Sequence, residues 1–414
     1  SIISTVKYNK IMRKITFFGL CVAASLAATA QTSVVKEAEQ QSKSGKYLEA
    51  IQTIQPALTN PETAQVVTTW FIPGKAGMEY YKEQYLNKTI GKDVDGAKMG
   101  HALIDGYNYL LKALPLDSLP DAKGKVKPKY SKEIVKLISE NYDHFNNAAV
   151  FLWDAKDYQG AYDTWDIIIN SPSNPVLGAN APKAYPDSTM ADIMFNQGLA
   201  AWQMENLELS LASFEKAIAI GYDKSQVYDY AINHAARLND NDKVYSLAEQ
   251  AYKKFGNENP LYLQLMINGR IEKQQYEEAA KMLDDAIAVS PNDAQLYNIK
   301  GVLFESMKDN DKARELYLQA INIDPTLAQA QYNYGRKLCD EAYAINDEAQ
   351  ANNMPNNEYQ KLREEKLNPL FRQAAEHLEA ALASEPQNQD AKTYLRNVYY
   401  NLGDEENLKR IENM

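Results

Sequence analysis

One stretch of this chain, residues 294–325, recurs along the sequence at a nearly constant distance. Within it, two amphipathic helical patterns are separated by a polar break at Lys308–Asp311. Small residues mark the recurrence and are separated by 34, 35 and 34 residues: Ala217, Ala251, Ala286 and Ala320. Such a period is typical of architectures in which a helix pair is too small to fold alone and stacks on its neighbours.

Six positions in this unit combine residue size with spacing, and a proline, Pro325, closes it. Counting Ala294 as position 1, large side chains occupy positions 4, 11 and 24, and small ones occupy positions 8, 20 and 27: Tyr297, Phe304 and Tyr317, then Gly301, Ala313 and Ala320. The small residues allow the helix axes to approach closely, and the aromatic rings fill the gaps beside them. The unit resembles the tetratricopeptide repeat. The resemblance implies an all-α fold, a right-handed α-solenoid of antiparallel helix pairs in which Ala313 and Tyr317 are buried.

The pattern, followed along the chain, predicts four segments. Residues 1–30 contain upstream sequence and a signal peptide, 31–170 hold irregular repeats, 171–190 form a Pro-, Ser- and Asn-rich loop, and 191–414 form a regular array. Within these segments we expect a Lys- and Pro-rich linker at Leu119–Lys129, an insertion at about 341–368 built from lengthened helix ends around a loop, and a terminal capping pair. The sequence leaves open whether the two halves form one continuous solenoid.

The N-terminal segment has the features of a signal peptide. Basic residues follow Met12, the stretch Ile15–Leu26 is apolar, and Ala28–Ala30 has the small-x-small pattern that precedes cleavage. We therefore predict export to the periplasm, with a lipid anchor or secretion as alternatives. The apolar run is shorter than the roughly 20 residues of a membrane span, so we expect no spanning segment after cleavage. The remaining thiol, Cys339, is expected to be buried and inert.

The charge balance argues against nucleic acid as a partner. The formal net charge is -11, and removing residues 1–30 takes away four basic residues and no acid, which gives -15. Phosphate binding needs clustered Lys and Arg, and the sequence shows no such cluster.

The resemblance also predicts a binding surface. In that family the first helix of each pair lines a concave groove, with positions 2, 5, 9 and 12 pointing into it. Carried over to this chain, these positions predict a groove for a protein or peptide partner lined by Phe195, Trp202, Asp229, Asn233, Gln264, Asn268, Asn298, Tyr332 and Arg336. Asparagine and glutamine amides suit the backbone of an extended peptide, although they are also ordinary solvated residues. Because Arg336 has no basic companion at matching positions, we expect no clamp for a C-terminal carboxylate.

No catalytic, cofactor or metal site is predicted. The four histidines, His101, His144, His234 and His377, are scattered over different repeats without metal-ligand spacing. Asp240 and Asp309 begin polar turns between helices, and turn chemistry accounts for both.

We therefore predict a non-catalytic protein–protein interaction scaffold or adaptor in the bacterial envelope, and two alternatives stay open. A glycan-binding protein would present aromatic faces, such as those of Trp202 and Tyr332, parallel to one groove floor. An enzyme would have its site in residues 63–188, with converging carboxylates or a histidine of shifted pKa in a pocket. A groove lined by Asn and Gln would favour a peptide.

Overall fold

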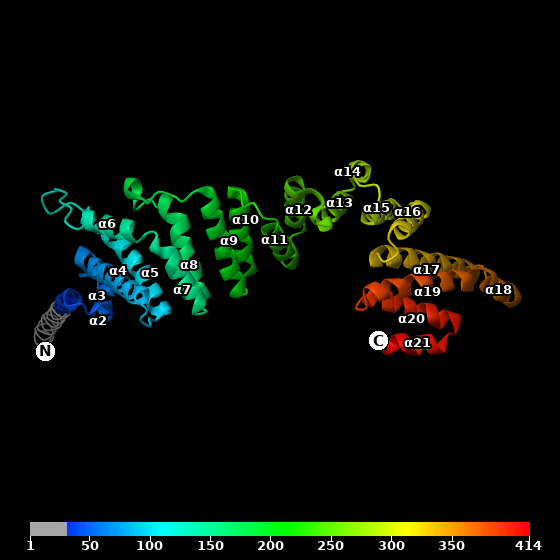
Figure 1. Cartoon of the computed structure of the whole chain (residues 1–414), viewed down its shortest axis with the longest axis horizontal. Helices are drawn as coiled ribbons and strands as arrows, with labels where there is room; N and C mark the ends of the chain where they lie inside the picture. Colours follow the sequence, from blue (N-terminus) through cyan, green and yellow to red (C-terminus); the bar gives the residue numbers. More distant parts are fainter. Residues whose placement is uncertain (1–30) are drawn as a thin grey trace, which may run out of the picture. The chain divides into compact units, whose positions relative to one another are not determined.

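The computed structural model describes residues 31–414, and throughout this range the chain is helical (Figure 1). The described residues contain no strand, only one isolated β-bridge between Pro120 and Val126. The all-α class expected from the repeat pattern is therefore confirmed. The expected signal peptide lies outside the described residues. The chain forms two compact units, one ending at Leu238 and the other covering Asn239–Met414.

The first unit starts with a helix over residues 31–43. The helices that follow are α2 (Tyr47–Thr53), α3 (Gln55–Thr59), α4 (Val67–Thr89), α5 (Gly96–Asp117), α6 (Ser131–Asn141), α7 (His144–Asp154), α8 (Tyr158–Asn170), the short η1 (Ser171–Ser173) and η2 (Gly178–Asn180), α9 (Asp187–Gln203), α10 (Leu207–Ile220) and α11 (Gln226–Arg237). Helices α4 and α5, α7 and α8, and α9 and α10 pack as neighbouring pairs.

The second unit continues with the same arrangement. Its helices are α12 (Asn241–Phe255), the short η3 (Gly256–Glu258), α13 (Pro260–Glu272), α14 (Tyr276–Val289), α15 (Ala294–Ser306), α16 (Asn310–Ile323), α17 (Ala328–Ala351), α18 (Asn356–Leu362), the π-helical η4 (Arg363–Leu367), α19 (Asn368–Ser384), α20 (Gln389–Leu402) and α21 (Glu405–Glu412). Helices α15 and α16, α17 and α19, and α20 and α21 pack together.

Several turns between consecutive helices share one local design. A residue with positive φ ends the first helix, and the Asp or Asn after it caps the second helix by accepting a hydrogen bond from a backbone N–H. The residues concerned are Lys156 and Asp157, Glu205 and Asn206, Asn239 and Asp240, and Lys308 and Asp309. Turn chemistry thus accounts for Asp240 and Asp309, as the sequence indicated.

Glycine at position 8 of a repeat allows close packing inside the pair. A Cβ added to Gly301 would lie 2.5 Å from the Tyr317 ring, and one added to Gly198 would lie 2.5 Å from the Phe214 ring. Tyr317, Phe214 and Ala313 are each fully buried. The predicted burial of Ala313 and Tyr317 is confirmed, and the ring of the second helix occupies the space that the missing Cβ leaves.

The polar stretches within the first unit are parts of its fold. The stretch Leu119–Lys129, expected to be a linker, is instead a closed loop between α5 and α6 within that unit. The loop at 171–190 joins α8 to α9, and its Leu177 is buried against the core of the same unit.

The insertion at about 341–368 lengthens helices in the second unit. Helix α17 continues to Ala351, the chain turns at residues 352–355, and α18, η4 and α19 lead back. Cys339 lies in α17 with no exposed surface, and burial raises the pKa of its thiol to about 12. The expected burial of this cysteine is therefore confirmed, and the raised pKa disfavours the reactive thiolate.

Candidate interaction surface

Two successive first helices of the second unit, α15 and α17, meet along a band of polar side chains. Contacts along this band include Gln295 to Gln329 at 3.2 Å, Asn333 to Asn298 at 3.0 Å, and Arg336 to Glu305 at 2.8 and 2.9 Å. We call these six residues the polar strip. Gln295 and Gln329 occupy position 2 of their repeats, so side chains from the predicted groove-lining register lie side by side on α15 and α17.

Asn298, predicted to face a ligand, is instead buried within the strip. Its side chain has no exposed surface, and its Oδ1 accepts the hydrogen bond from Asn333. Its Nδ2 has no hydrogen-bond partner among the described residues. Asn333 stands at position 6 of its repeat, one place after the predicted position 5. It was missed because the register of one helix does not show which residue of the next helix lies opposite it.

Arg336 is neutralised by an acid that the sequence analysis did not single out. Glu305 accepts both guanidinium hydrogen bonds and lies 2.9 Å from the Lys337 ammonium, and the Tyr317 hydroxyl donates to it at 2.8 Å. Burial alone raises the pKa of Glu305, but its bonds to Arg336, Lys337 and Tyr317 outweigh burial and lower it to about 2. Arg336 is therefore engaged within the fold, which agrees with the absence of a carboxylate clamp.

The other predicted residues of the second unit remain accessible. Gln264 and Asn268 on α13 are half-buried. Tyr332 is half-buried too, with its ring centroid 6.0 Å from that of Tyr394 and 5.9 Å from the Arg336 guanidinium. Amides, one phenol ring and a neutralised ion pair thus dominate this part of the predicted surface.

The predicted residues of the first unit form a different environment. Phe195 is buried, and its ring stacks on Tyr222 at 4.9 Å and on Tyr230 at 6.1 Å, with interplanar angles of 17° and 12°. Trp202 is half-buried and meets Tyr230 and His234 edge-on. These rings pack on one another, so Phe195 is a core residue and presents no open aromatic face.

The two polar residues predicted beside this aromatic cluster lie on α11. Asp229 is half-buried and Asn233 is exposed. His234, next to Asn233, is fully buried, and its Nε2 lies 3.0 Å from the Ser210 hydroxyl, which itself donates to the Gly198 carbonyl. Burial lowers the pKa of His234 and keeps the ring neutral.

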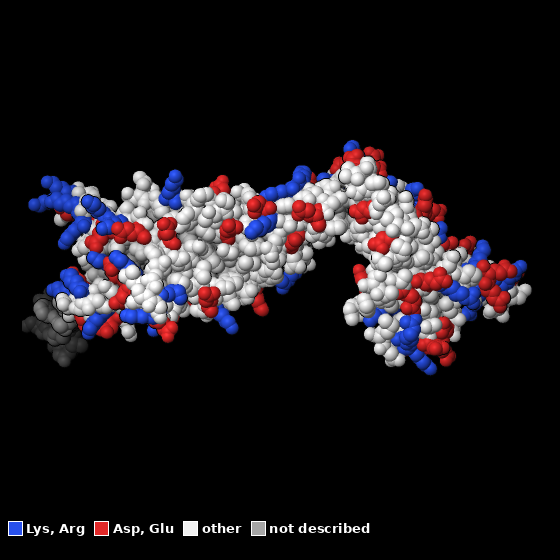
Figure 2. Space-filling model, viewed as in Figure 1, with Lys and Arg blue, Asp and Glu red and all other residues white. Residues whose placement is uncertain are grey.

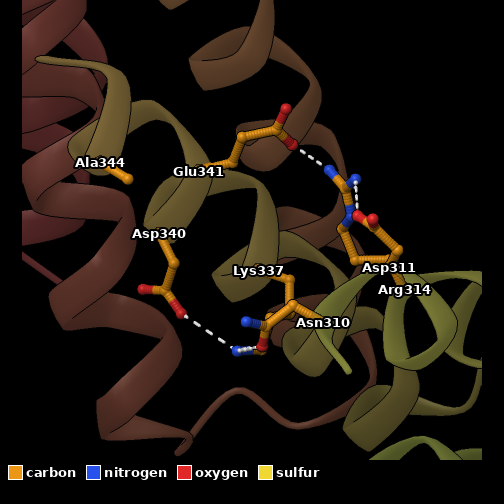
Figure 3. A pocket seen from close by; sticks show the side chains of 7 residues that line it. All are labelled: Asn310, Asp311, Arg314, Lys337, Asp340, Glu341 and Ala344. Atoms are coloured by element: carbon orange, nitrogen blue, oxygen red, sulfur yellow. Dashed lines mark hydrogen bonds and ion pairs between the residues drawn. The ribbon is translucent and has the colours of Figure 1, made fainter. Parts of the chain in front are cut away.

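A cavity of about 290 Å³ lies next to the polar strip, between α16 and α17 (Figure 3). The residues that line it are Asn310, Asp311, Arg314, Lys337, Asp340, Glu341 and Ala344. Arg314 pairs with Asp311 and Glu341, and Lys337 binds Asn310 and approaches Asp340. Glu341 and Ala344 belong to the lengthened part of α17, so the insertion builds one wall.

Residues of the region considered for an enzyme, 63–188, line a cavity together with residues of the preceding helices, and the acids along it are Glu39 and Glu79. A cavity of about 220 Å³ includes Phe71, Lys75 and Glu79 on α4. Lys75 pairs with Glu133 at 2.6 Å. Burial lowers the pKa of His144, but its ring packs against Tyr81 and Tyr85 and does not line that cavity.

Two structural features are absent from residues 31–414. In this part of the chain, no three His, Cys, Asp or Glu side chains are placed to hold a metal ion. None of its helices combines the length and the apolar character that crossing a membrane requires.

Comparison with known proteins identifies the repeats. Residues 191–220 and 266–328 match sequence models of the tetratricopeptide repeat. No curated protein sequence matches the chain.

Solved structures resemble the chain only weakly. IFIT1 bound to Gppp-AAAA is 16% identical, with 81% of this chain and 72% of that chain covered and a TM-score of 0.39. YrrB, described as a tetratricopeptide-repeat protein with an unusual peptide-binding site, is 19% identical over 47% of this chain and 94% of that one, with a TM-score of 0.32. MamA from Desulfovibrio magneticus RS-1 is 15% identical over 48% and 96%, with a TM-score of 0.31.

Proposed function

We propose that this chain, which is a tetratricopeptide-repeat protein, is a non-catalytic scaffold that binds an extended segment of a partner protein along the polar strip of α15 and α17. Proteins of this family generally serve as interaction scaffolds. The observation that carries the proposal is the alignment of amides from successive first helices, with Gln295 bonded to Gln329 at 3.2 Å.

The glutamine pair retains hydrogen-bonding capacity for a ligand. An amide carries two N–H donors and an oxygen with two lone pairs. The bond between Gln295 and Gln329 uses one donor and one lone pair, and both side chains are half-exposed. The remaining groups match the alternating N–H and C=O groups of an extended peptide backbone.

The charge of the strip also favours a peptide backbone over a charged ligand. Glu305 already neutralises Arg336, and Lys337 shares that carboxylate. A ligand carboxylate would have to displace Glu305, whose pKa of about 2 reflects strong binding by its partners. Neutral backbone groups need no such displacement.

A glycan is less well matched by these surfaces. Sugar recognition by stacking needs an open aromatic face, whereas the nearly parallel rings of Phe195, Tyr222 and Tyr230 cover one another. In the second unit, Tyr332 meets Tyr394 edge-on at 75°.

The proposed location is the bacterial envelope, after cleavage behind Ala30. The support is the sequence pattern alone, in which an apolar run is followed by Ala28–Ala30. Cell fractionation and the mass of the chain recovered from cells test this proposal. A chain that starts at Gln31 and is found in the periplasm supports it, whereas an unprocessed chain in the cytoplasm contradicts it.

Selection from a displayed library of random unstructured peptides tests the binding proposal. The full repeat region, residues 31–414, should enrich related sequences. Their affinity should fall about 30-fold in a Gln295→Leu, Gln329→Leu double variant, since each glutamine would lose a hydrogen bond to the peptide that contributes about 1 kcal/mol. A Gln319→Leu variant, changed at an exposed residue of α16, should bind as the wild type does.

Two results would overturn the binding proposal. One is a library from which no peptide family is enriched. The other is equal loss of affinity in the double variant and the Gln319→Leu control. Far-UV circular dichroism of all three proteins shows whether their helices are intact.

A further inference from the structure

The loop between α5 and α6, residues 118–130, gathers basic side chains in the stretch that was expected to be a Lys- and Pro-rich linker. Four lysines alternate with Gly, Val and Pro: Lys123, Lys125, Lys127 and Lys129. All residues from 118 to 129 are exposed. Figure 2 shows basic side chains projecting at the upper left, where Figure 1 places this loop next to α6. The expectation that Lys and Arg are not clustered is therefore wrong for this loop.

The base of the loop is fixed by a buried carboxylate. Asp117 is 7% exposed and accepts hydrogen bonds from the backbone N–H groups of Lys129, Tyr130 and Ser131 at 3.1, 2.8 and 2.6 Å. The Ser131 hydroxyl donates to it as well, at 2.6 Å. The two ends of the loop are thus held together, and the lysines project from a defined position.

The tip of the loop is organised by a second carboxylate. One oxygen of Asp121 accepts from the N–H groups of Lys123 and Lys125 at 2.8 and 2.9 Å. Gly124 adopts a φ of +74° in this turn, and Pro120 forms a bridge with Val126. The tip is therefore a tight turn whose backbone N–H groups are directed inward.

The lysine charges of this loop remain available to a partner. The carboxylates of Asp117 and Asp121 are occupied by backbone N–H groups. None of the four lysines forms an ion pair within the described residues, and only Lys129 has a partner of another kind, the Tyr130 ring at 5.4 Å. The loop is thus a concentrated positive charge on a chain whose net charge is -11.

Exposed apolar side chains accompany these charges. Leu119 is 57% exposed and Val126 is 53% exposed. Because an isolated bridge joins Pro120 to Val126, Leu119 and Val126 lie on opposite arms of the same turn. Lysines beside small exposed apolar side chains suit a membrane interface, where the ammonium groups meet lipid phosphates and the apolar groups enter the headgroup layer.

We propose that this loop docks the protein on a membrane surface rich in anionic phospholipid. Nucleic acid fits the loop less well, because the loop contains no arginine and its one aromatic side chain, Tyr130, packs against the Phe71 ring at 4.7 Å. The acidic remainder of the chain would also repel a long polyanion lying across it. A lipid surface needs to contact only the tip.

The expected strength follows from the number of lysines. Each lysine near an anionic surface contributes about a fivefold gain in partitioning, so four lysines give a gain on the order of 100-fold or more. This attraction is screened within about 8 Å at physiological salt and about 3 Å at 1 M salt. Binding is therefore reversible and sensitive to salt.

Vesicle cosedimentation of residues 31–414, the part that contains every helix described above, tests the proposal. The probes are vesicles of pure phosphatidylcholine and vesicles of 70% phosphatidylcholine with 30% phosphatidylglycerol. We expect binding to the anionic vesicles alone, and its loss in 1 M salt. Replacing the four loop lysines by serine should reduce partitioning on the order of 100-fold, and Leu119→Ser with Val126→Ser should reduce it about tenfold.

A charge-matched variant distinguishes the effect of the loop lysines from the effect of the net charge of the chain. Serine at Lys82, Lys92, Lys98 and Lys112, four exposed lysines elsewhere in the first unit, removes the same charge and should leave partitioning within about twofold of wild type. Equal partitioning to both vesicle types, equal loss in the two quadruple variants, or binding to soluble polyphosphate without binding to vesicles would each overturn the proposal.

Discussion

The contacts of Glu305 with Arg336 and Lys337 provide a test of how the second unit is stabilised. Replacing Glu305 by Gln removes the negative charge that faces Arg336 and Lys337, and it replaces one of the two oxygens that accept hydrogen bonds from Arg336 by an NH2 donor. These two basic side chains are only 19% and 10% exposed. The variant therefore leaves two largely buried positive charges with Asp340 as their remaining acidic neighbour, at 3.5 and 3.7 Å.

Two independent estimates give the size of the effect. Lowering the pKa of Glu305 from 4.5 to about 2 corresponds to about 3 kcal/mol at about 1.4 kcal/mol per pKa unit. Removing one partner of a buried ion pair typically costs about 3 to 5 kcal/mol. We therefore expect Glu305→Gln to lower the free energy of unfolding of the second unit by about 3 kcal/mol.

The pH dependence of the free energy of unfolding tests the same interaction in a second way. Because the pKa of Glu305 is lower in the folded state, its contribution is fully present above about pH 4.5 and is lost as the pH falls towards 2. Wild type should lose about 3 kcal/mol across this window through Glu305, and the Gln variant should lack that component.

Hydrogen exchange of the backbone amides in α15 and α17 measures the change in local stability. Urea unfolding followed by circular dichroism measures the change in the total free energy of unfolding. All four tryptophans, at positions 70, 153, 165 and 202, lie in the first unit, so their fluorescence reports that unit separately. Glu315→Gln is the control, because the 67% exposed side chain of Glu315 pairs with Lys312 on the surface. This substitution should change the free energy of unfolding by less than about 0.5 kcal/mol. A Glu305→Gln variant as stable as this control, or acid unfolding curves that run parallel to wild type, would refute the reasoning.

Three further predictions follow from other contacts. Gly301→Ala should destabilise by about 1 to 3 kcal/mol in urea unfolding, because its Cβ would lie 2.5 Å from Tyr317; a gain of about 1 kcal/mol, as helix propensity alone predicts, would contradict this packing. Asp117→Asn should loosen the base of its loop and speed tryptic cleavage after Lys123–Lys129 severalfold, whereas unchanged cleavage would show that the carboxylate does not hold it. Burial lowers the pKa of His234, so stability of the first unit should fall as pH drops below about 6.5. Tryptophan fluorescence should show a smaller fall in His234→Phe than in wild type, with the remainder due to His144, whose pKa burial also lowers; an equal fall in the two proteins would contradict this role of His234.

Much of the fold was predictable from side-chain size at fixed spacing. Gly301, Ala313 and Tyr317 recur at positions where two helix axes must approach, and the structure buries all three. Asp240 and Asp309 were assigned to turns from residue type, and both cap the helix that follows. These features depend on local sequence, so a single chain reveals them.

The candidate surface was only partly predictable, because its interactions join residues far apart in sequence. The register placed Asn298 and Arg336 on the expected face but did not show that Asn333 and Glu305, 35 and 31 positions away, would bind them. Phe195 was assigned to a groove, yet rings from the next repeat cover it.

The loop at 118–130 shows the same limit for charge. Its alternating lysines are typical of a linker in the sequence. In the structure, hydrogen bonds to Asp117 and Asp121 fold the same stretch into a closed loop.

A hydrogen-exchange footprint of a selected peptide tests the central claim most directly. In the complex, added protection should concentrate in the segments of α15 and α17 that contain Gln295 and Gln329, with a smaller effect in α13 around Gln264 and Asn268. Protection confined to α16, or to the helices of the first unit, would show that the partner binds elsewhere. The polar strip would then only hold α15 and α17 together.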